Sequence, residues 1–270
     1  VVDSAQEDDF FGFALAAGDF DDDGADDLAI GVPGEDVVKD TTTLEDAGAV
    51  NIIFGSQSFG GLSPEDNEMW HQDVDGVDET STASGDEFGY ALTTGNFDGN
   101  SFPDLAIGVP GENGDAGQVQ VLYGFSSGLS ASFDQVWDQD RVEGQVSETG
   151  DRFGAALLAG DFLRANDIDE LLVGAPDEIL DGLLVGNVSL IQGSREGLTE
   201  DESLAWRPAD LGLTEVAGQS FGFALAGGDF NNDRLPDLAI GNPYDEPTSV
   251  QNSGSVSVMY GNSDSTSPTV

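Results

Sequence analysis

The chain has 270 residues, and its 38% hydrophobic content with 16 phenylalanines and three tryptophans suffices for a folded core, which excludes a disordered acidic tail. Its 53 acidic and seven basic residues give a formal net charge of −46, which argues against a nucleic-acid partner and disfavours anionic membranes. Cysteine is absent, which excludes disulfides, zinc–thiolate sites and cysteine nucleophiles.

Two explanations of the acidity stand side by side. A solvated acidic surface suits high salt, where screening weakens self-repulsion, and Lys39 as the only lysine favours this halophilic-like explanation across the surface. Carboxylates gathered at one place can instead hold cations, and the clustering at residues 19–27 favours that explanation there. No run of about 18 apolar residues occurs, so we expect a soluble segment without direct membrane insertion.

Four stretches of similar sequence follow one another, beginning at Phe11, Phe88, Phe153 and Phe221. Each opens with Phe-Gly, passes through an acidic loop and enters an apolar segment such as Asp-Leu-Ala-Ile-Gly. We expect one domain, residues 1–270, built from four repeats. Their approximate boundaries are 11–87, 88–152, 153–220 and 221–270.

Each repeat predicts up to four short strands, taken in chain order. The Phe-Gly-x-Ala-Leu segment and the apolar segment after the acidic loop predict the first two. A Gly-x-Val segment with alternating residues predicts the third, at 48–55, 117–124, 186–193 and 254–261. A tryptophan-bearing stretch predicts the fourth, around Trp70, Trp137 and Trp206. Repeated four-stranded units predict an all-β fold, a β-propeller of four blades, over a solenoid or a tandem of sandwiches.

The acidic loops predict calcium sites in three repeats. Oxygen-bearing side chains stand at the first, third, fifth and ninth loop positions, and the seventh needs only its backbone carbonyl, which is the spacing of a tight Ca²⁺ loop. The predicted ligands are Asp19, Asp21, Asp23, Ala25 and Asp27; Asn96, Asp98, Asn100, Phe102 and Asp104; and Asp229, Asn231, Asp233, Leu235 and Asp237. An EF-hand is excluded because its twelfth position, normally glutamate, is isoleucine inside a strand pattern here.

The third repeat departs from this pattern. Its loop is one residue longer and places Leu163 and Ala165 at the third and fifth positions. We expect no metal there, with Arg164 as a candidate internal cation. The residues of this degenerate loop that carry oxygen are Asp161, Asn166, Asp167 and Glu170.

The combination of Phe-Gly, the calcium loop and Gly-x-Pro, in that order, resembles the FG-GAP repeat of integrin α-subunit β-propellers and of bacterial surface proteins. The resemblance covers nearly the whole chain. It implies about three Ca²⁺ ions in loops between the first and second strands of a blade. It also implies an extracellular or cell-surface setting and a role in adhesion or protein recognition.

Closure of the propeller stays open at this point. Integrin propellers have seven blades, whereas this chain has four Phe-Gly strands and three tryptophan strands. Either four blades close into a ring that lacks one outer strand, which we favour slightly, or the chain is a four-blade piece of a larger propeller.

One further set of acidic residues recurs after the Gly-x-Pro turns. A functional interpretation makes these residues a ring of axial carboxylates that holds a cation or a basic partner, and the favoured alternative is turn chemistry at strand ends. They are Glu35, Glu112, Glu178 and Asp245.

These observations predict a non-catalytic Ca²⁺-binding module that recognises a protein or glycan ligand. Its partner face would lie opposite the calcium loops, where the connections differ between repeats, at 36–47, 113–116, 177–185 and 245–253. We expect no enzyme, because the acidic clusters repeat with the architecture, whereas an active site should break that symmetry. The alternatives are a carbohydrate-binding or glycan-active propeller and a purely structural domain of a larger surface protein.

Overall fold

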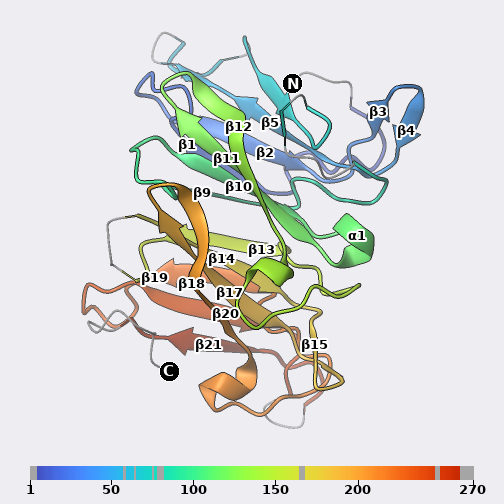
Figure 1. Cartoon of the computed structure of the whole chain (residues 1–270), viewed down its shortest axis with the longest axis vertical. Coiled ribbons are helices and arrows are strands. Elements are labelled where there is room, and N and C mark those ends of the chain that lie inside the picture. The colour runs from blue at the N-terminus through green and yellow to red at the C-terminus, as the bar shows by residue number, and fades with distance from the viewer. Residues whose placement is uncertain are drawn as a thin grey trace.

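The computed structural model describes residues 5–56, 59–63, 65–74, 76–77, 82–163, 168–246 and 250–261. Four antiparallel sheets dominate it (Figure 1), and each corresponds to one repeat. Blade 1 consists of β1 (Leu15–Gly18), β2 (Asp27–Val32), β5 (Ala49–Ile53) and β8 (Glu68–Trp70). Blade 2 consists of β9 (Ala91–Gly95), β10 (Asp104–Val109), β11 (Gln118–Phe125) and β12 (Gly128–Trp137).

The other two blades repeat this order. Blade 3 consists of β13 (Ala156–Gly160), β14 (Glu170–Ala175), β17 (Asn187–Ser194) and β18 (Gly197–Trp206). Blade 4 consists of β19 (Ala224–Gly228), β20 (Asp237–Asn242) and β21 (Ser255–Met259). Its outer strand is absent among the described residues, in keeping with the missing fourth tryptophan.

Short elements fill the connections. Three hairpins pair β3 (Val37–Lys39) with β4 (Thr42–Leu44), β6 (Gly55–Ser56) with β7 (Gly61–Leu62), and β15 (Ile179–Leu180) with β16 (Leu183–Leu184). The single helical turn α1 (Glu112–Asp115) and the 3-10 turns Gln139–Arg141 and Pro208–Leu211 complete the described elements. The β3–β4 hairpin, α1 and β15 lie along one side of the molecule in Figure 1.

One predicted boundary is wrong. The Phe-Gly pair was expected inside the first strand, but β1 begins at Leu15, and Phe11 and Gly12 form a turn before it. The glycine of each pair has a φ near +90°, as Gly12 (90°) and Gly89 (90°) show, a conformation that extended strand backbone does not adopt. The motif therefore marks the turn that leads into a blade.

The core lies between blades. The side chain of Phe20, from the acidic loop of blade 1, is 1% exposed and packs with Leu105, Ile107 and Leu122 of blade 2. Phe97 repeats this contact against Leu171 of blade 3. Each sheet therefore buries one face against the sheet that follows it, as expected for propeller blades.

The blades form a curved row. The innermost strands contact one another in the order β1, β9, β13, β19, and the first and last sheets lie toward opposite ends of the long axis (Figure 1). The propeller arrangement of four blades predicted from the repeats is confirmed. Among the described residues, blade 4 does not pack on blade 1 as the other blades pack on their successors, so the closed ring that we favoured is not seen there. Val256 of β21 is 67% exposed, whereas its equivalent Val50 in β5 is fully buried.

Candidate metal centre

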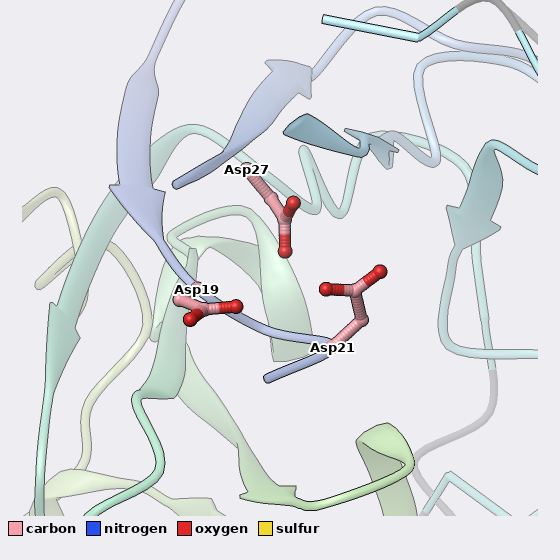
Figure 2. A group of neighbouring side chains, drawn as sticks. All are labelled: Asp19, Asp21 and Asp27. Atoms are coloured by element: carbon pink, nitrogen blue, oxygen red, sulfur yellow. The ribbon is translucent and has the colours of Figure 1, made fainter. Parts of the chain in front are cut away.

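Three carboxylates meet in the loop between β1 and β2. Asp19, Asp21 and Asp27 each offer an oxygen, and these oxygens all lie within 4.8 Å of one another. Figure 2 shows the three side chains turned toward one another. Asp19 follows the end of β1 and Asp27 opens β2, so the hairpin itself brings the two ends of the loop together.

Backbone amides hold this loop in shape. The carboxylate of Asp19 accepts hydrogen bonds from the amides of Asp23 (3.0 Å) and Gly24 (2.9 Å). Asp21 accepts from the amide of Asp23 (3.2 Å), and Asp23 accepts from that of Ala25 (2.8 Å). These bonds curl the chain around its own carboxylates, and each bonded oxygen keeps a lone pair for a cation. The carboxylate of Asp23 does not belong to the group of three converging carboxylates.

Asp27 is the buried anchor of the loop. One carboxylate oxygen accepts from the amide of Phe20 (2.7 Å) and the other from the amide of Gly55 (2.7 Å). A Cβ at Gly55 would lie 2.2 Å from the carbonyl oxygen of Asp26, so only glycine allows this approach. Gly124 and Gly261 donate in the same way to Asp104 and Asp237. Sequence reasoning noticed these repeated glycines but gave them no role.

The fourth loop repeats the first. Asp229 accepts from the amides of Asp233 (3.0 Å) and Arg234 (2.9 Å), and Asn231 accepts from the amide of Asp233 (2.9 Å). The ninth-position Asp237 accepts from the amide of Phe230 (2.7 Å). The amide of the seventh-position residue, Leu235, donates to Asp233 (2.8 Å), as Ala25 does to Asp23.

The second loop keeps most of these bonds. Asp98 accepts from the amide of Asn100 (2.9 Å), and the Asn100 side chain accepts from the amide of Phe102 (2.8 Å). Asp104 is fully buried and accepts from the amide of Phe97 (2.7 Å). The Oδ1 atom of Asn96, the first predicted ligand, is buried and has no hydrogen-bond partner among the described residues. A cation would satisfy that oxygen.

The electrostatics of these loops favour a cation. Burial, with a smaller contribution from neighbouring carboxylates, raises the pKa of Asp27 to about 6 and that of Asp104 to about 7. Burial also raises the pKa of Asp21 and Asp98. Hard carboxylate and amide oxygens, gathered where charge is costly, are the donor set that Ca²⁺ prefers, so the residues fit the predicted ion.

The third loop is built differently. Glu170 opens β14 at the position of Asp27, and one of its oxygens accepts from the amide of Leu163 (2.9 Å). The other oxygen is buried without a hydrogen-bond partner among the described residues. Leu163 is 9% exposed and packs in the hydrophobic core with Leu238 of blade 4. Arg164, Ala165, Asn166 and Asp167 lie outside the described residues.

The candidate axial carboxylates connect neighbouring blades. Glu112 and Glu178 are buried and accept hydrogen bonds from Gln72 (2.7 Å) and Gln139, which follow the outer strands of the preceding blades. Asp245 accepts from the hydroxyl of Ser255 (2.6 Å) in its own blade. Glu35 is buried as well. Glu112 and Glu178 thus form buried hydrogen bonds between blades, and the ring of axial carboxylates stays a prediction.

The inner ends of the blades line a shared cavity. Its volume is about 310 Å³, and it lies at the Phe-Gly ends of the inner strands, opposite the acidic loops. Arg152 lies over the ring of Tyr90, 5.1 Å from its centroid, and also donates to Glu87 (2.9 Å). The cavity is lined by Phe13, Tyr90, Arg152, Ala155, Pro176, Asp177 and Phe223. Sequence reasoning did not find this cavity, although the repeated aromatic residue after Phe-Gly was a visible signal.

Known proteins resemble the chain over most of its length. The FG-GAP repeat matches residues 11–52, 88–122 and 221–259, which leaves out the third repeat with its altered loop. Integrin alpha-PS2 of Drosophila melanogaster is 27% identical over 247 residues, which are 88% of this chain and 16% of that protein. Integrin alpha pat-2 of Caenorhabditis briggsae is 29% identical over 244 residues, 86% of this chain and 18% of that protein.

One of the similar proteins is an enzyme. Phosphatidylinositol-glycan-specific phospholipase D of Rattus norvegicus is 30% identical over 237 residues, 86% of this chain and 26% of that protein. The chain thus spans about a sixth to a quarter of the length of these relatives. No helix among the described residues is long and apolar enough to cross a membrane. The chain thus carries FG-GAP repeats in three of its blades, has a β-propeller fold and is similar to integrin alpha subunits.

Proposed function

We propose that the chain is a Ca²⁺-stabilised recognition module of an extracellular or cell-surface protein, without catalytic activity of its own. The observation that carries this proposal is one loop geometry found at the same place in three blades. In each loop the ninth-position aspartate is fixed by two backbone amides; these residues are Asp27, Asp104 and Asp237. Repetition with the blades suits a structural ion better than a single active site.

Calcium would act by neutralising buried charge. Without a cation, the loop of blade 1 holds three carboxylates within 4.8 Å, and their repulsion favours opening the β1–β2 hairpin. With Ca²⁺ bound, the hairpin and the packing of Phe20 on blade 2 become stable together. The ion therefore supports the blade-to-blade core as well as the loop.

The recognition face is proposed at the opposite end of the strands. The connections that differ between repeats lie there, among them the β3–β4 hairpin, α1 and the β15–β16 hairpin. The cavity beside Tyr90 and Arg152 lies at the same end. Residues 247–249 of the fourth predicted connection lie outside the described residues. A protein or glycan partner with a positively charged group would suit the acidic chain.

The alternatives have less support. A glycan-active cleft would need the Gly-x-Pro carboxylates and the tryptophans exposed together, but Glu112 and Glu178 are buried in hydrogen bonds with glutamines, and Trp137 is fully buried. The similarity to a phospholipase D covers only 26% of that enzyme, so most of the enzyme lies outside the match. We propose that this part of the enzyme corresponds to a non-catalytic module.

Thermal unfolding with calcium tests the metal. Saturating Ca²⁺ should raise the melting temperature strongly over the chelated protein, since a site filled at about 100 times its Kd contributes about 2.7 kcal/mol. Asp19→Asn with Asp21→Asn should reduce this shift. The matched control is Asp22→Asn with Asp26→Asn, which changes exposed carboxylates in the same loop and should keep it. A wild-type protein indifferent to calcium would refute the structural-metal proposal.

A further inference from the structure

The outer strands of blades 2 and 3 contain the same bulge. In β12, residues 131–134 stand opposite the single residue Leu122 of β11. In β18, residues 200–203 bulge at the equivalent place. One residue in each bulge has a positive φ, Phe133 (77°) in blade 2 and Glu202 (58°) in blade 3. Both precede the tryptophan of their blade by four positions, so the two residues are structurally equivalent.

Blade 2 carries an aromatic side chain where the other two carry an acidic one. Asp66 occupies this position in blade 1, with a φ of 58°. Aspartate tolerates a positive φ, whereas the same conformation is unfavourable for a bulky residue. Phe133 adopts it nevertheless, and its side chain is 83% exposed. Backbone strain and exposure at one aromatic residue point to a role in binding.

A cavity of about 270 Å³ lies beside Phe133, between blades 2 and 3. Tyr123, Phe125 and Phe133 line it from blade 2, and residues 195–197 of the β17–β18 hairpin line it from blade 3. Asp98 of the second acidic loop completes the lining. The cavity is therefore at the acidic-loop end of the strands, opposite the proposed recognition face.

Tyr123 holds the two walls of this cavity together. Its hydroxyl accepts from the amide of Leu198 (2.9 Å) in blade 3 and donates to the side-chain oxygen of Gln135 (2.5 Å) in blade 2. The side-chain amide of Gln135 in turn donates to the carbonyl of Leu198 (3.1 Å). A Cβ at Gly197 would lie 2.4 Å from the Tyr123 hydroxyl oxygen, so only glycine allows the hairpin to approach this closely. The cavity is thus preformed.

Arg195 offers this cavity an uncommitted positive charge. It is exposed and makes no ion pair with another described residue. Most other described basic residues are paired with acidic side chains, namely Lys39, Arg141, Arg152 and Arg207. Ser126 takes the place of Arg195 in the β11–β12 hairpin, since each forms a bridge with the glycine two residues later. The cavity thus lies where Phe133 and Arg195 both depart from the repeat pattern, as residues of a binding site should.

We propose that this cavity binds a neutral sugar ring of a glycan. The C–H face of the ring packs on the exposed Phe133, Arg195 donates to hydroxyl oxygens, and the carboxylate of Glu196 accepts from hydroxyl groups. A sugar satisfies the guanidinium and the carboxylate together, whereas an apolar protein side chain would cover both without a hydrogen-bond partner. An acidic ligand is disfavoured because the net charge of −46 repels it.

Saturation-transfer difference NMR of the 270-residue chain in calcium tests this inference. The probes are the methyl glycosides of glucose, galactose, mannose and N-acetylglucosamine. We expect saturation transfer to at least one of them, strongest at ring C–H protons. Phe133→Asp should raise the Kd of that sugar by about tenfold. Its melting temperature should equal or exceed that of wild type, because blade 1 has aspartate at this position with a positive φ.

Two further variants make the test specific. Arg195→Ser copies the β11–β12 hairpin and should also weaken sugar binding. Phe59→Asp is the matched control, because Phe59 is a 58% exposed phenylalanine in the β6–β7 hairpin of blade 1, outside the cavity; it should bind as wild type does.

N-acetyl-phenylalanine and its amide serve as competing probes for a protein partner. Binding of these compounds at Phe133, with no saturation transfer to any glycoside, would assign the cavity to a protein side chain and overturn the inference. Sugar binding that Phe133→Asp leaves unchanged would overturn it as well.

Discussion

The first and third acidic loops occupy the same place in their blades and differ in what anchors them. Asp27 opens β2 and satisfies two backbone amides, those of Phe20 and Gly55, one with each carboxylate oxygen. Glu170 opens β14 and satisfies one amide, that of Leu163, while its second oxygen is buried without a hydrogen-bond partner among the described residues.

The difference shows how a propeller keeps a blade while changing its loop. In blade 1 the loop closes through oxygen atoms, so Asp19, Asp21 and Asp27 converge. In blade 3 the loop supplies Leu163 to the hydrophobic core beside Leu238, and no ligand stands at that position. The apolar packing of Leu163 thus holds the third loop against its blade, as the proposed cation would hold the first loop. In both blades the second strand is buried, at every position in β14 and at every position except Leu28 in β2.

The largest expected effect is the difference in stability between the variants that remove Asp27 and Glu170. Asp27→Ala leaves two buried amides unpaired and removes a proposed calcium ligand, so we expect the free energy of unfolding in calcium to fall by roughly 3–5 kcal/mol. Glu170→Ala leaves one amide unpaired and should cost roughly 1–2 kcal/mol. Urea unfolding in saturating Ca²⁺ measures both. An equal fall in the free energy of unfolding in the two variants would show that neither the second amide hydrogen bond of Asp27 nor the calcium ion adds to stability.

The second prediction concerns pH. Burial raises the pKa of Glu170 to about 7 from 4.5, so the folded state binds more protons than the unfolded state between these values. The free energy of unfolding should therefore fall as pH rises from about 4.5 to 7, by at most about 1.4 kcal/mol per pH unit for one group. Bound calcium would hold Asp27 and its equivalents ionised, so in calcium this dependence should come from Glu170 and from other buried carboxyls whose pKa is raised, such as Asp86 and Asp151 (both to about 6).

Glu170→Gln provides the control for this dependence. Its amide keeps an oxygen for the amide of Leu163 and cannot titrate, so the slope between pH 5 and 7 should become flatter in thermal unfolding with calcium present. The same slope in the variant and in wild type would assign the dependence to other buried carboxyls, such as Glu178, whose pKa burial also raises to about 7.

Much of this architecture could be predicted from sequence because the repeats are local. The alternation around Val50 and its equivalents, the loop spacing and the tryptophan stretches each predicted a strand or a turn that the structure contains. The absent fourth tryptophan correctly predicted a three-stranded blade in the described residues.

What could not be predicted depends on contacts between distant segments. The amide of Gly55 reaches Asp27 across 28 residues, and Gln72 reaches Glu112 in the next blade across 40. No spacing rule within a single repeat encodes such bonds. The same holds for Val256 of blade 4, which is 67% exposed although it has the same sequence context as the buried Val50.

The smallest expected effect concerns our prediction that the third loop binds no calcium, and it tests whether Glu170 alone or the whole loop sequence would prevent binding. Glu170→Asp restores the anchor of the other loops, but Leu163 remains in the core and offers no oxygen. We expect the number of calcium ions bound, measured by isothermal titration, to stay at the wild-type value and the stability to change by less than about 1 kcal/mol. An additional bound ion would mean that the longer loop can fold around a cation and that the acidic anchor alone decides between the two solutions.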